Sequence, residues 1–202
     1  MYVLLLPVKY HKMKLYKIET GNLKLDGGAM FGVVPKSLWS KAYPEDENNL
    51  CNWSMRCLLV VDGDRKILID NGIGDKQDWK FLRHYHLNGE ATLEGSLNDI
   101  GFTPEDITDV ILTHLHFDHC GGSIIYNEDR SGYKLAFPNA TYWTSRQQYN
   151  WAIEPNHREQ ASFLKENILP IEESGHLKLI EEEGEFLPNI TAKLYQIGRA
   201  HV

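Results

Sequence analysis

The most informative part of this sequence is Val110-Ile111-Leu112-Thr113-His114-Leu115-His116-Phe117-Asp118-His119-Cys120-Gly121-Gly122. Its first three residues are apolar and indicate a short buried β-strand, so the polar residues lie on the loop that follows the strand. His114 and His116 point to the same side of an extended chain, whereas Asp118 and His119 follow where the chain turns. Imidazole and carboxylate groups are ligands that zinc accepts. The spacing therefore predicts a metal site made by His114, His116, Asp118 and His119.

Two blocks of the sequence resemble a known family. The pattern His-x-His-x-Asp-His at residues 114–119, followed by Gly121-Gly122, resembles the metallo-β-lactamase superfamily. Residues 25–36 (LDGGAMFGVVPK), followed by Leu-Trp-Ser-Lys at 38–41, resemble the N-terminal signature of its YtnP-like branch, whose members are regarded as quorum-quenching N-acyl-homoserine lactonases. The resemblance covers residues 14–195. It implies an α/β fold, the αβ/βα sandwich, with only the first half and a little more present.

The resemblance also implies a site and a reaction. His114 and His116 would hold one zinc ion, and Asp118 and His119 a second. A hydroxide bound to the metals would attack the carbonyl of a small-molecule lactone and open its ring. Asp118 would in addition steer a proton to the leaving oxygen, since a carboxylate at the metal is well placed for acid–base work. We therefore expect a zinc-dependent lactone hydrolase of the N-acyl-homoserine-lactone class.

Two further segments bear on that site. Asp70-Asn71-Gly72 resembles the Asp-x-Gly motif of the superfamily, in which the Asp orients a metal-binding imidazole; the alternative is an ordinary turn residue before glycine. The loop at residues 27–32 is either a tight packing turn or a wall of the substrate mouth. In the second case, Met30 and Phe31 are candidates to touch an acyl chain.

Several alternatives remain open at this stage. The same ligand set serves hydrolases of β-lactams, thioesters and phosphodiesters, and the superfamily also includes iron-containing redox proteins. A truncated, inactive metal-binding fragment is a third possibility. Cys120 is a ligand or, as we expect, a packing residue beside the loop. We expect His84, His86 and His157 to be surface residues rather than pocket residues.

Composition limits the class of protein. The chain has 202 residues, enough for one domain, with 42% hydrophobic and 24% charged residues. A net charge of −7 and the lack of a basic cluster argue against a nucleic-acid partner. No apolar stretch is long enough to span a bilayer, and three cysteines without paired spacing argue against disulfides. We expect a cytoplasmic protein, and the sequence does not indicate its oligomeric state.

Both ends of the chain look atypical. We expect residues 1–12 to be a non-native or disordered extension before a start at Met13, and residues 13–196 to be the domain, incomplete at its C-terminus. Residues 197–202 match the translation of a common sequencing-adapter stretch and are expected to be an artefactual tail. The family pattern supplies its remaining metal ligands after Tyr195. His201 is not expected to replace them, because the family's Gly-His step falls at Gly198-Arg199.

Local patterns predict the order of helices and strands. A hairpin around Gly21-Asn22 is expected from residues 14–19 and 23–25, and another, with Asp-Gly at its turn, from residues 55–61 and 66–69. Capping residues predict helices that follow Thr92 and Ser145. Further expected elements are a strand at 140–144, a helix at 158–168 ended by Pro170, and strands at 177–180 and 190–195.

Overall fold

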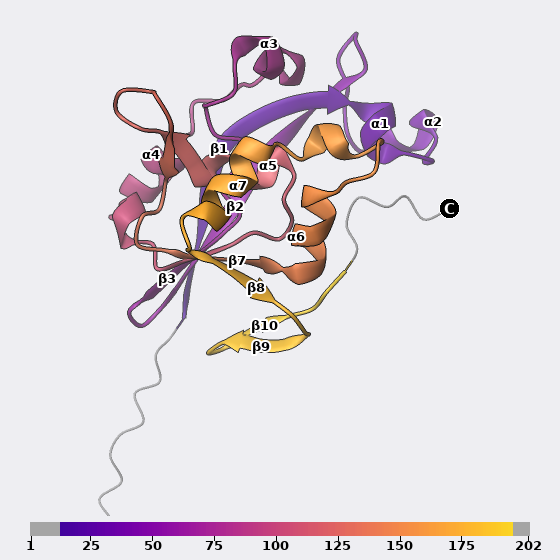
Figure 1. The fold of residues 1–202 in the computed structure, drawn as a ribbon. Helices are drawn as coiled ribbons and strands as arrows, with labels where there is room; N and C mark the ends of the chain where they lie inside the picture. Colours follow the sequence, from indigo (N-terminus) through magenta and orange to yellow (C-terminus); the bar gives the residue numbers. More distant parts are fainter. Residues whose placement is uncertain (1–12, 196–202) are drawn as a thin grey trace, which may run out of the picture.

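A mixed sheet of six strands organises the domain. The computed structural model describes residues 13–195, so the predictions for residues 1–12, for residues 197–202 and for His201 concern parts of the chain outside it. The strand order is β1-β2-β3-β4-β7-β8, antiparallel from β1 to β3 and parallel from β3 to β8 (Figure 1). The bounds are β1 Lys14–Asp26, β2 Leu50–Asp62, β3 Arg65–Ile69, β4 Asp109–Ile111, β7 Thr141–Ser145 and β8 Leu177–Ile180.

The first two hairpin predictions had different outcomes. β2 and β3 form the predicted hairpin: Asp62 pairs with Arg65, and Gly63 supplies the positive φ of 62° at the turn. The hairpin predicted around Gly21-Asn22 is wrong, because both segments belong to the single strand β1. Gly21 has a φ of 95°, but the register shift between Glu19 and Asn22 absorbs it as a bulge. β2 is long enough to pair with β1 on both sides of that bulge.

Helices cover one face of the sheet and make the main core with it. They are α4 Leu93–Asn98, α6 Arg146–Ile153 and α7 Lys165–Glu173 (Figure 1). Leu97 and Ile168 from the helices are buried in one cluster with Leu68, Val110 and Tyr142 from the strands. The predicted caps are present: Thr92 and Ser145 accept hydrogen bonds from backbone amides three residues on, at 3.0 Å each. These layers confirm the predicted α/β class.

The helix predicted for residues 158–168 is wrong in position. A 3-10 turn at Gln160–Ser162 comes first, and α7 then runs through Pro170 instead of ending there. A proline inside a helix removes one backbone hydrogen bond. Ile168 and Ile171 are each 2% exposed, and burial of this apolar face offsets the loss.

Short elements complete the described chain. They are the helices α1 Gly27–Phe31, α2 Lys36–Trp39, α3 Trp79–Leu82 and α5 Phe117–Cys120 and the 3-10 turns at Arg83–Tyr85, Pro104–Asp106 and Gly121–Ser123. β5 Ile124–Tyr126 pairs with β6 Tyr133–Leu135, and β9 Gly184–Leu187 pairs with β10 Ile190–Ala192. None of the helices in residues 13–195 is long and apolar enough to cross a membrane.

The loop after β3 packs tightly on the loop after β4. The amide of Asn71 donates to the carbonyl of His119 at 2.9 Å, and the amide of Gly122 donates to the carbonyl of Gly72 at 3.0 Å. A Cβ at Gly121 would lie 2.0 Å from the Ile73 carbonyl oxygen, and one at Gly122 would lie 2.2 Å from that of Asn71. Only glycine allows this approach, so the Gly-Gly pair fixes the distance between the two loops.

Lys76 links the same two loops through a hydrogen bond. Its side chain is 4% exposed, and its ammonium donates a hydrogen bond to the Gly121 carbonyl. Burial lowers the pKa of Lys76 from 10.5 to about 8. The ammonium form is therefore disfavoured in the folded state, and folding favours the neutral amine.

This burial predicts a pH-dependent contribution to stability. Between pH 8 and 10.5 the unfolded chain retains a proton on Lys76 that the folded chain releases, so the free energy of unfolding rises with pH. Across this range the free energy of unfolding of the wild type should rise by about 3 kcal/mol relative to that of Lys76→Met, because one pKa unit corresponds to about 1.4 kcal/mol. Urea unfolding at several pH values measures the difference.

The exposed Lys80 provides the matched control. The free energy of unfolding of Lys80→Met should differ from that of the wild type by the same amount at every pH in this range. If the difference in the free energy of unfolding between the wild type and Lys76→Met does not change from pH 7 to 11, burial does not lower the pKa of Lys76.

Candidate metal centre

The four predicted ligand residues come together where β4 ends. The chain leaves β4 at Ile111, and His116 occupies the N-cap of α5 with φ −66° and ψ 148°. The ring centroid of His114 lies 4.6 Å from that of His116 and 3.9 Å from that of His119. Asp118 follows in the first turn of α5. The structure thus gathers three imidazoles and one carboxylate, as the spacing predicts.

Asp70 holds this group from the neighbouring strand. It directly follows β3, and its φ of 56° is unusual for a residue other than glycine. Its Oδ2 accepts a hydrogen bond from Nδ1 of His119 at 2.9 Å. Thr113 donates to the same carboxylate twice, from its amide at 2.8 Å and from its hydroxyl at 2.8 Å. The imidazole contact predicted for Asp70 is present, so this residue is more than an ordinary turn residue.

These hydrogen bonds determine the tautomers of two imidazoles. A carboxylate only accepts, so the contact with Asp70 requires that Nδ1 of His119 carries the proton. The hydroxyl of Thr113 has one proton, which it gives to Asp70. Its 3.1 Å contact with Nδ1 of His114 therefore requires the imidazole to be the donor. Both rings are left with the lone pair on Nε2, the atom available to a metal.

Nε2 of His119 faces an acceptor. It lies 3.5 Å from Oδ2 of Asp118, and both atoms carry lone pairs when His119 is neutral. Two acceptors at this distance repel each other unless a proton or a metal cation lies between them. Burial alone lowers the pKa of His119, but the hydrogen bond to Asp70 and the charges of Asp118 and Asp70 outweigh burial and raise it. The arrangement therefore attracts a positive charge.

The other two imidazoles are held in their neutral form. Burial, together with the neighbouring His119 and His116, lowers the pKa of His114 to about 3. Burial also lowers the pKa of His116, despite the opposing charge of Asp118. A neutral imidazole is the form that binds a metal, so both rings are in the required state at neutral pH.

The imidazole and carboxylate groups are of the kinds that zinc binds. In this structure, however, they are not arranged around a single point. Within residues 13–195, no three His, Cys, Asp or Glu side chains form a group that could hold a metal ion. Cys120 does not add a donor: its thiol is buried, donates to the Leu115 carbonyl at 3.4 Å, and has a pKa raised by burial to about 12. All three cysteines are free, as expected.

A cavity of about 100 Å³ opens beside this group. Asp70, Asp118 and His119 line it together with Met30. The remaining lining residues are Leu23, Leu25, Trp53, Ser54, Met55, Arg56 and Cys57. Phe31 does not line it and instead stacks on Trp39, with ring centroids 4.8 Å apart. Of the two candidate substrate contacts, the structure brings only Met30 to the site.

Sequence reasoning did not identify two of these contributions. Thr113 stands directly before the motif, and its position was a usable signal, but its link to Asp70 spans 43 residues. Arg56 lies on β2 and reaches the cavity without any local motif. His84, His86 and His157 are exposed, as predicted.

Comparison with known proteins identifies the family. Residues 56–126, which contain the whole histidine motif and Asp70, match the family model described as the metallo-beta-lactamase superfamily. An N-acyl homoserine lactonase of Bacillus thuringiensis is 30% identical over 199 residues, which cover 93% of this chain and 66% of the lactonase. The chain belongs to the metallo-β-lactamase superfamily. It spans just under two thirds of the length of that lactonase.

Solved structures of two hydrolases show the same fold. A probable metal-dependent hydrolase from Staphylococcus aureus is 34% identical, with a TM-score of 0.80 over 89% of this chain and 62% of that one. An N-acyl homoserine lactone hydrolase with N-hexanoyl-L-homoserine bound at its catalytic metal centre is 25% identical. Its TM-score is 0.60 over 88% of this chain and 63% of that one. The predicted fold is therefore confirmed.

The contacts of Asp70 generate a prediction about metal affinity. Asp70→Asn puts an amide where one carboxylate oxygen accepts from Thr113 or His119, so the imidazoles lose their fixed tautomers. We expect zinc to bind about 10- to 100-fold more weakly, the usual effect of losing such a partner. Thr113→Val removes the hydroxyl contacts with His114 and Asp70 but keeps the amide bond to Asp70 and the bond between Asp70 and His119, and should weaken binding less. Competition with a chromophoric chelator measures both.

Asp64 lies exposed in the β2–β3 turn, so Asp64→Asn makes the same charge change away from the site and should leave zinc affinity unchanged. Equal zinc affinity in Asp70→Asn and the wild type would show that Asp70 does not support the metal centre.

Proposed function

We propose that this protein is a zinc-dependent hydrolase that opens the ring of an N-acyl-homoserine lactone. His114 and His116 would be ligands of one zinc ion, and Asp118 and His119 of a second. The observation that supports this most strongly is the 3.5 Å approach of Nε2 of His119 to the Asp118 carboxylate, with the opposite ring nitrogen fixed by Asp70. Two acceptors facing each other need a cation, and the neighbouring imidazoles are neutral donors.

Four donors are fewer than two zinc ions require. The proposal assigns the remaining ligands to sequence outside residues 13–195. When bound, zinc would supply Lewis-acid polarisation of a carbonyl oxygen and lower the pKa of water. The chain's own residues have separate tasks, which follow from their positions.

Asp118 is the proposed acid–base group. Its carboxylate lines the cavity and is partly accessible, with 28% of the side chain exposed. From there it can accept a proton from the attacking water and deliver it to the alkoxide oxygen that ring opening releases. Asp70 takes no part in proton transfer, because its oxygens already accept hydrogen bonds from Thr113 and His119.

The cavity wall supports an acylated substrate. Leu23, Met30 and Trp53 present apolar surface beside the two carboxylates. Met30 is 46% exposed, so a flexible side chain stands where the cavity meets solvent. A flexible thioether side chain adapts to alkyl groups of different length, which suits the acyl chain of such a lactone. The names of the lactonase relatives favour the same substrate class.

Zinc binding and ring opening test the proposal together. The chain of residues 1–202, freed of metal, should bind zinc through these four donors. A protein that also carries the remaining ligands should open a long-chain N-acyl-homoserine lactone, measured by proton release, only after zinc is added. Asp118→Asn should lower the rate by about 10²- to 10⁴-fold, the range expected for loss of an acid–base group. His116→Ala should weaken zinc binding, measured by metal content after gel filtration.

His157→Ala changes an exposed histidine and should alter neither property. Zinc binding that survives His116→Ala would contradict the ligand assignment. Faster hydrolysis of a β-lactam, a thioester or a phosphodiester than of the lactone would contradict the substrate class while leaving the metal centre in place.

A further inference from the structure

Glu159 is a buried acidic residue that the proposed reaction does not use. Its exposed fraction is only 8%, although the residues beside it, 156–158 and 160, are all exposed. The chain therefore turns this one side chain of the segment inward. Acidic side chains are seldom buried in proteins unless they are paired, so the position of Glu159 needs a partner that explains it.

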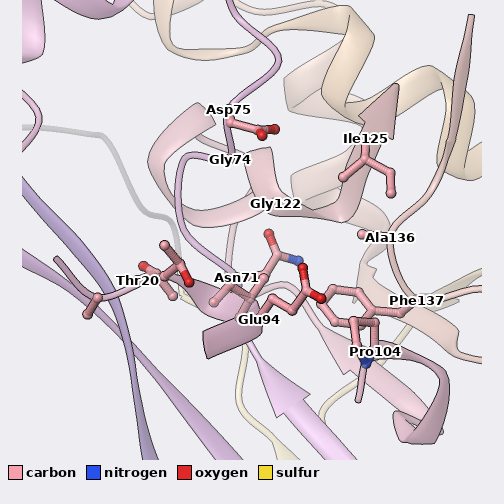
Figure 2. A pocket seen from close by; sticks show the side chains of 13 residues that line it. Thr20, Asn71, Gly74, Asp75, Glu94, Pro104, Gly122, Ile125, Ala136 and Phe137 are labelled. Atoms are coloured by element: carbon pink, nitrogen blue, oxygen red, sulfur yellow. The ribbon is translucent and has the colours of Figure 1, made fainter. Parts of the chain in front are cut away.

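Other acidic residues of the domain show what is unusual here. Asp75 and Glu94 line a larger cavity of about 380 Å³, which shares no lining residue with the smaller one, and both are exposed (Figure 2). Asp109 is buried, but each of its oxygens has a donor. Nε1 of Trp143 donates to one at 2.9 Å, and the hydroxyl of Thr108 donates to the other at 2.8 Å.

Only one oxygen of Glu159 is held in this way. Its Oε2 accepts hydrogen bonds from Nε1 of Trp151 and from Nδ2 of Asn156, at 3.0 Å each. Its backbone amide donates to Oδ1 of Asn156, also at 3.0 Å. Its Oε1 is buried and has no hydrogen-bond partner within residues 13–195. A buried carboxylate oxygen without a donor is costly, so a further donor for Oε1 is expected.

The segment that carries Glu159 packs on one of the proposed metal ligands. Phe163 follows the 3-10 turn Gln160–Ser162, and its ring centroid lies 4.8 Å from that of His116. Burial lowers the pKa of His116, whereas the negative charges of Asp118 and Glu159 act to raise it. The carboxylate of Glu159 is thus close enough to act electrostatically on this imidazole.

His116 is also the proposed ligand whose ring has no fixed partner. Nδ1 of His119 donates to Asp70, and Nδ1 of His114 donates to Thr113. In the described part of the chain, neither ring nitrogen of His116 forms a hydrogen bond. An imidazole that binds a metal almost always donates its other N–H to a carboxylate, a carbonyl or a water molecule.

We propose that Glu159 is the positioning residue for His116. When His116 binds zinc through one ring nitrogen, the N–H of the other donates to Oε1 of Glu159, directly or through one water molecule. Metal binding makes this N–H a stronger donor, and it supplies the partner that the buried oxygen lacks. The two side chains are not hydrogen-bonded to each other within the structure described, so the contact is assigned to the zinc-bound state. This role rests on the metal centre proposed above.

Two other roles for Glu159 fit the structure less well. Glu159 is not among the residues that line the cavity beside His119, so it does not meet a substrate there as an acid or a base. A role in folding alone would use the bonds from Trp151 and Asn156 to Oε2 and would leave Oε1 without a purpose.

Glu159→Gln separates a positioning role from a role in folding. Its amide oxygen can accept from Trp151 and Asn156, which places the NH₂ group where Oε1 was. Two donors then face each other at His116, so the chain of residues 1–202 should bind zinc about tenfold or more weakly, measured by competition with a chromophoric chelator. The metal-free variant should be at least as stable as the wild type in urea, because it loses a buried charge.

A matched control and a second measurement make the result specific. Glu154→Gln makes the same charge change at the exposed C-cap of α6 and should leave zinc affinity unchanged. In the zinc-loaded wild type, ¹H–¹⁵N NMR spectra should show an imidazole N–H of His116 that exchanges with water more slowly than that of the exposed His157. Glu159→Gln should remove this protection.

Equal zinc affinity in Glu159→Gln and the wild type overturns the role of Glu159 and leaves the metal centre in place. An N–H of His116 that exchanges as fast as that of His157 in the zinc-loaded wild type overturns it as well. A wild-type chain that binds no zinc overturns the metal centre itself, and the role of Glu159 with it.

Discussion

The carboxylate of Asp70 is the interaction on which the candidate site depends. It receives hydrogen bonds from the amide and hydroxyl of Thr113 and from Nδ1 of His119. Asp70 holds a left-handed backbone conformation to do so, a geometry that costs on the order of 1 kcal/mol. Its amide donates to the Ile111 carbonyl at 2.9 Å, which fixes the residue at the edge of the parallel strands β3 and β4. The sheet thereby determines where two imidazoles point.

Close packing behind the site keeps this arrangement in place. Gly121 and Gly122 allow the loop after β4 to touch the backbone of the loop after β3, and Lys76 ties the two together from a buried position. The two loops therefore behave as one support. Two consecutive residues after β3 line different cavities: Asp70 lines the smaller cavity with His119, and Asn71 lines the larger one.

The sequence was sufficient where chemistry and local pattern coincide. Residues 114–119 could be recognised because four ligand-type side chains occupy six positions after an apolar strand. The β2–β3 hairpin followed from Asp-Gly between apolar runs. Asp70 could be assigned to an imidazole through its resemblance to a motif. In each case the signal lies within about ten residues of chain.

Features that depend on distant contacts could not be predicted. The bulge at Gly21 replaces a turn only because β2 offers a partner along its whole length, and α7 runs through Pro170 because Ile168 and Ile171 find a core to fill. The hydrogen bond from Asn71 to Ser123 joins residues 52 positions apart. Phe31 does not line the cavity beside His119, because its ring stacks on that of Trp39 instead. Neighbours of this kind are determined by tertiary packing, which local periodicity does not encode.

The most direct test of the central claim is the tautomeric state of His114 and His119. Long-range ¹H–¹⁵N NMR spectra of the metal-free chain, recorded at a pH above the ionisation of both rings, report which ring nitrogen carries the proton. The hydrogen bonds through Asp70 and Thr113 predict a protonated Nδ1 and an unprotonated Nε2 on both rings. A proton on Nε2 of either ring would contradict the view that Asp70 prepares these imidazoles to bind a metal.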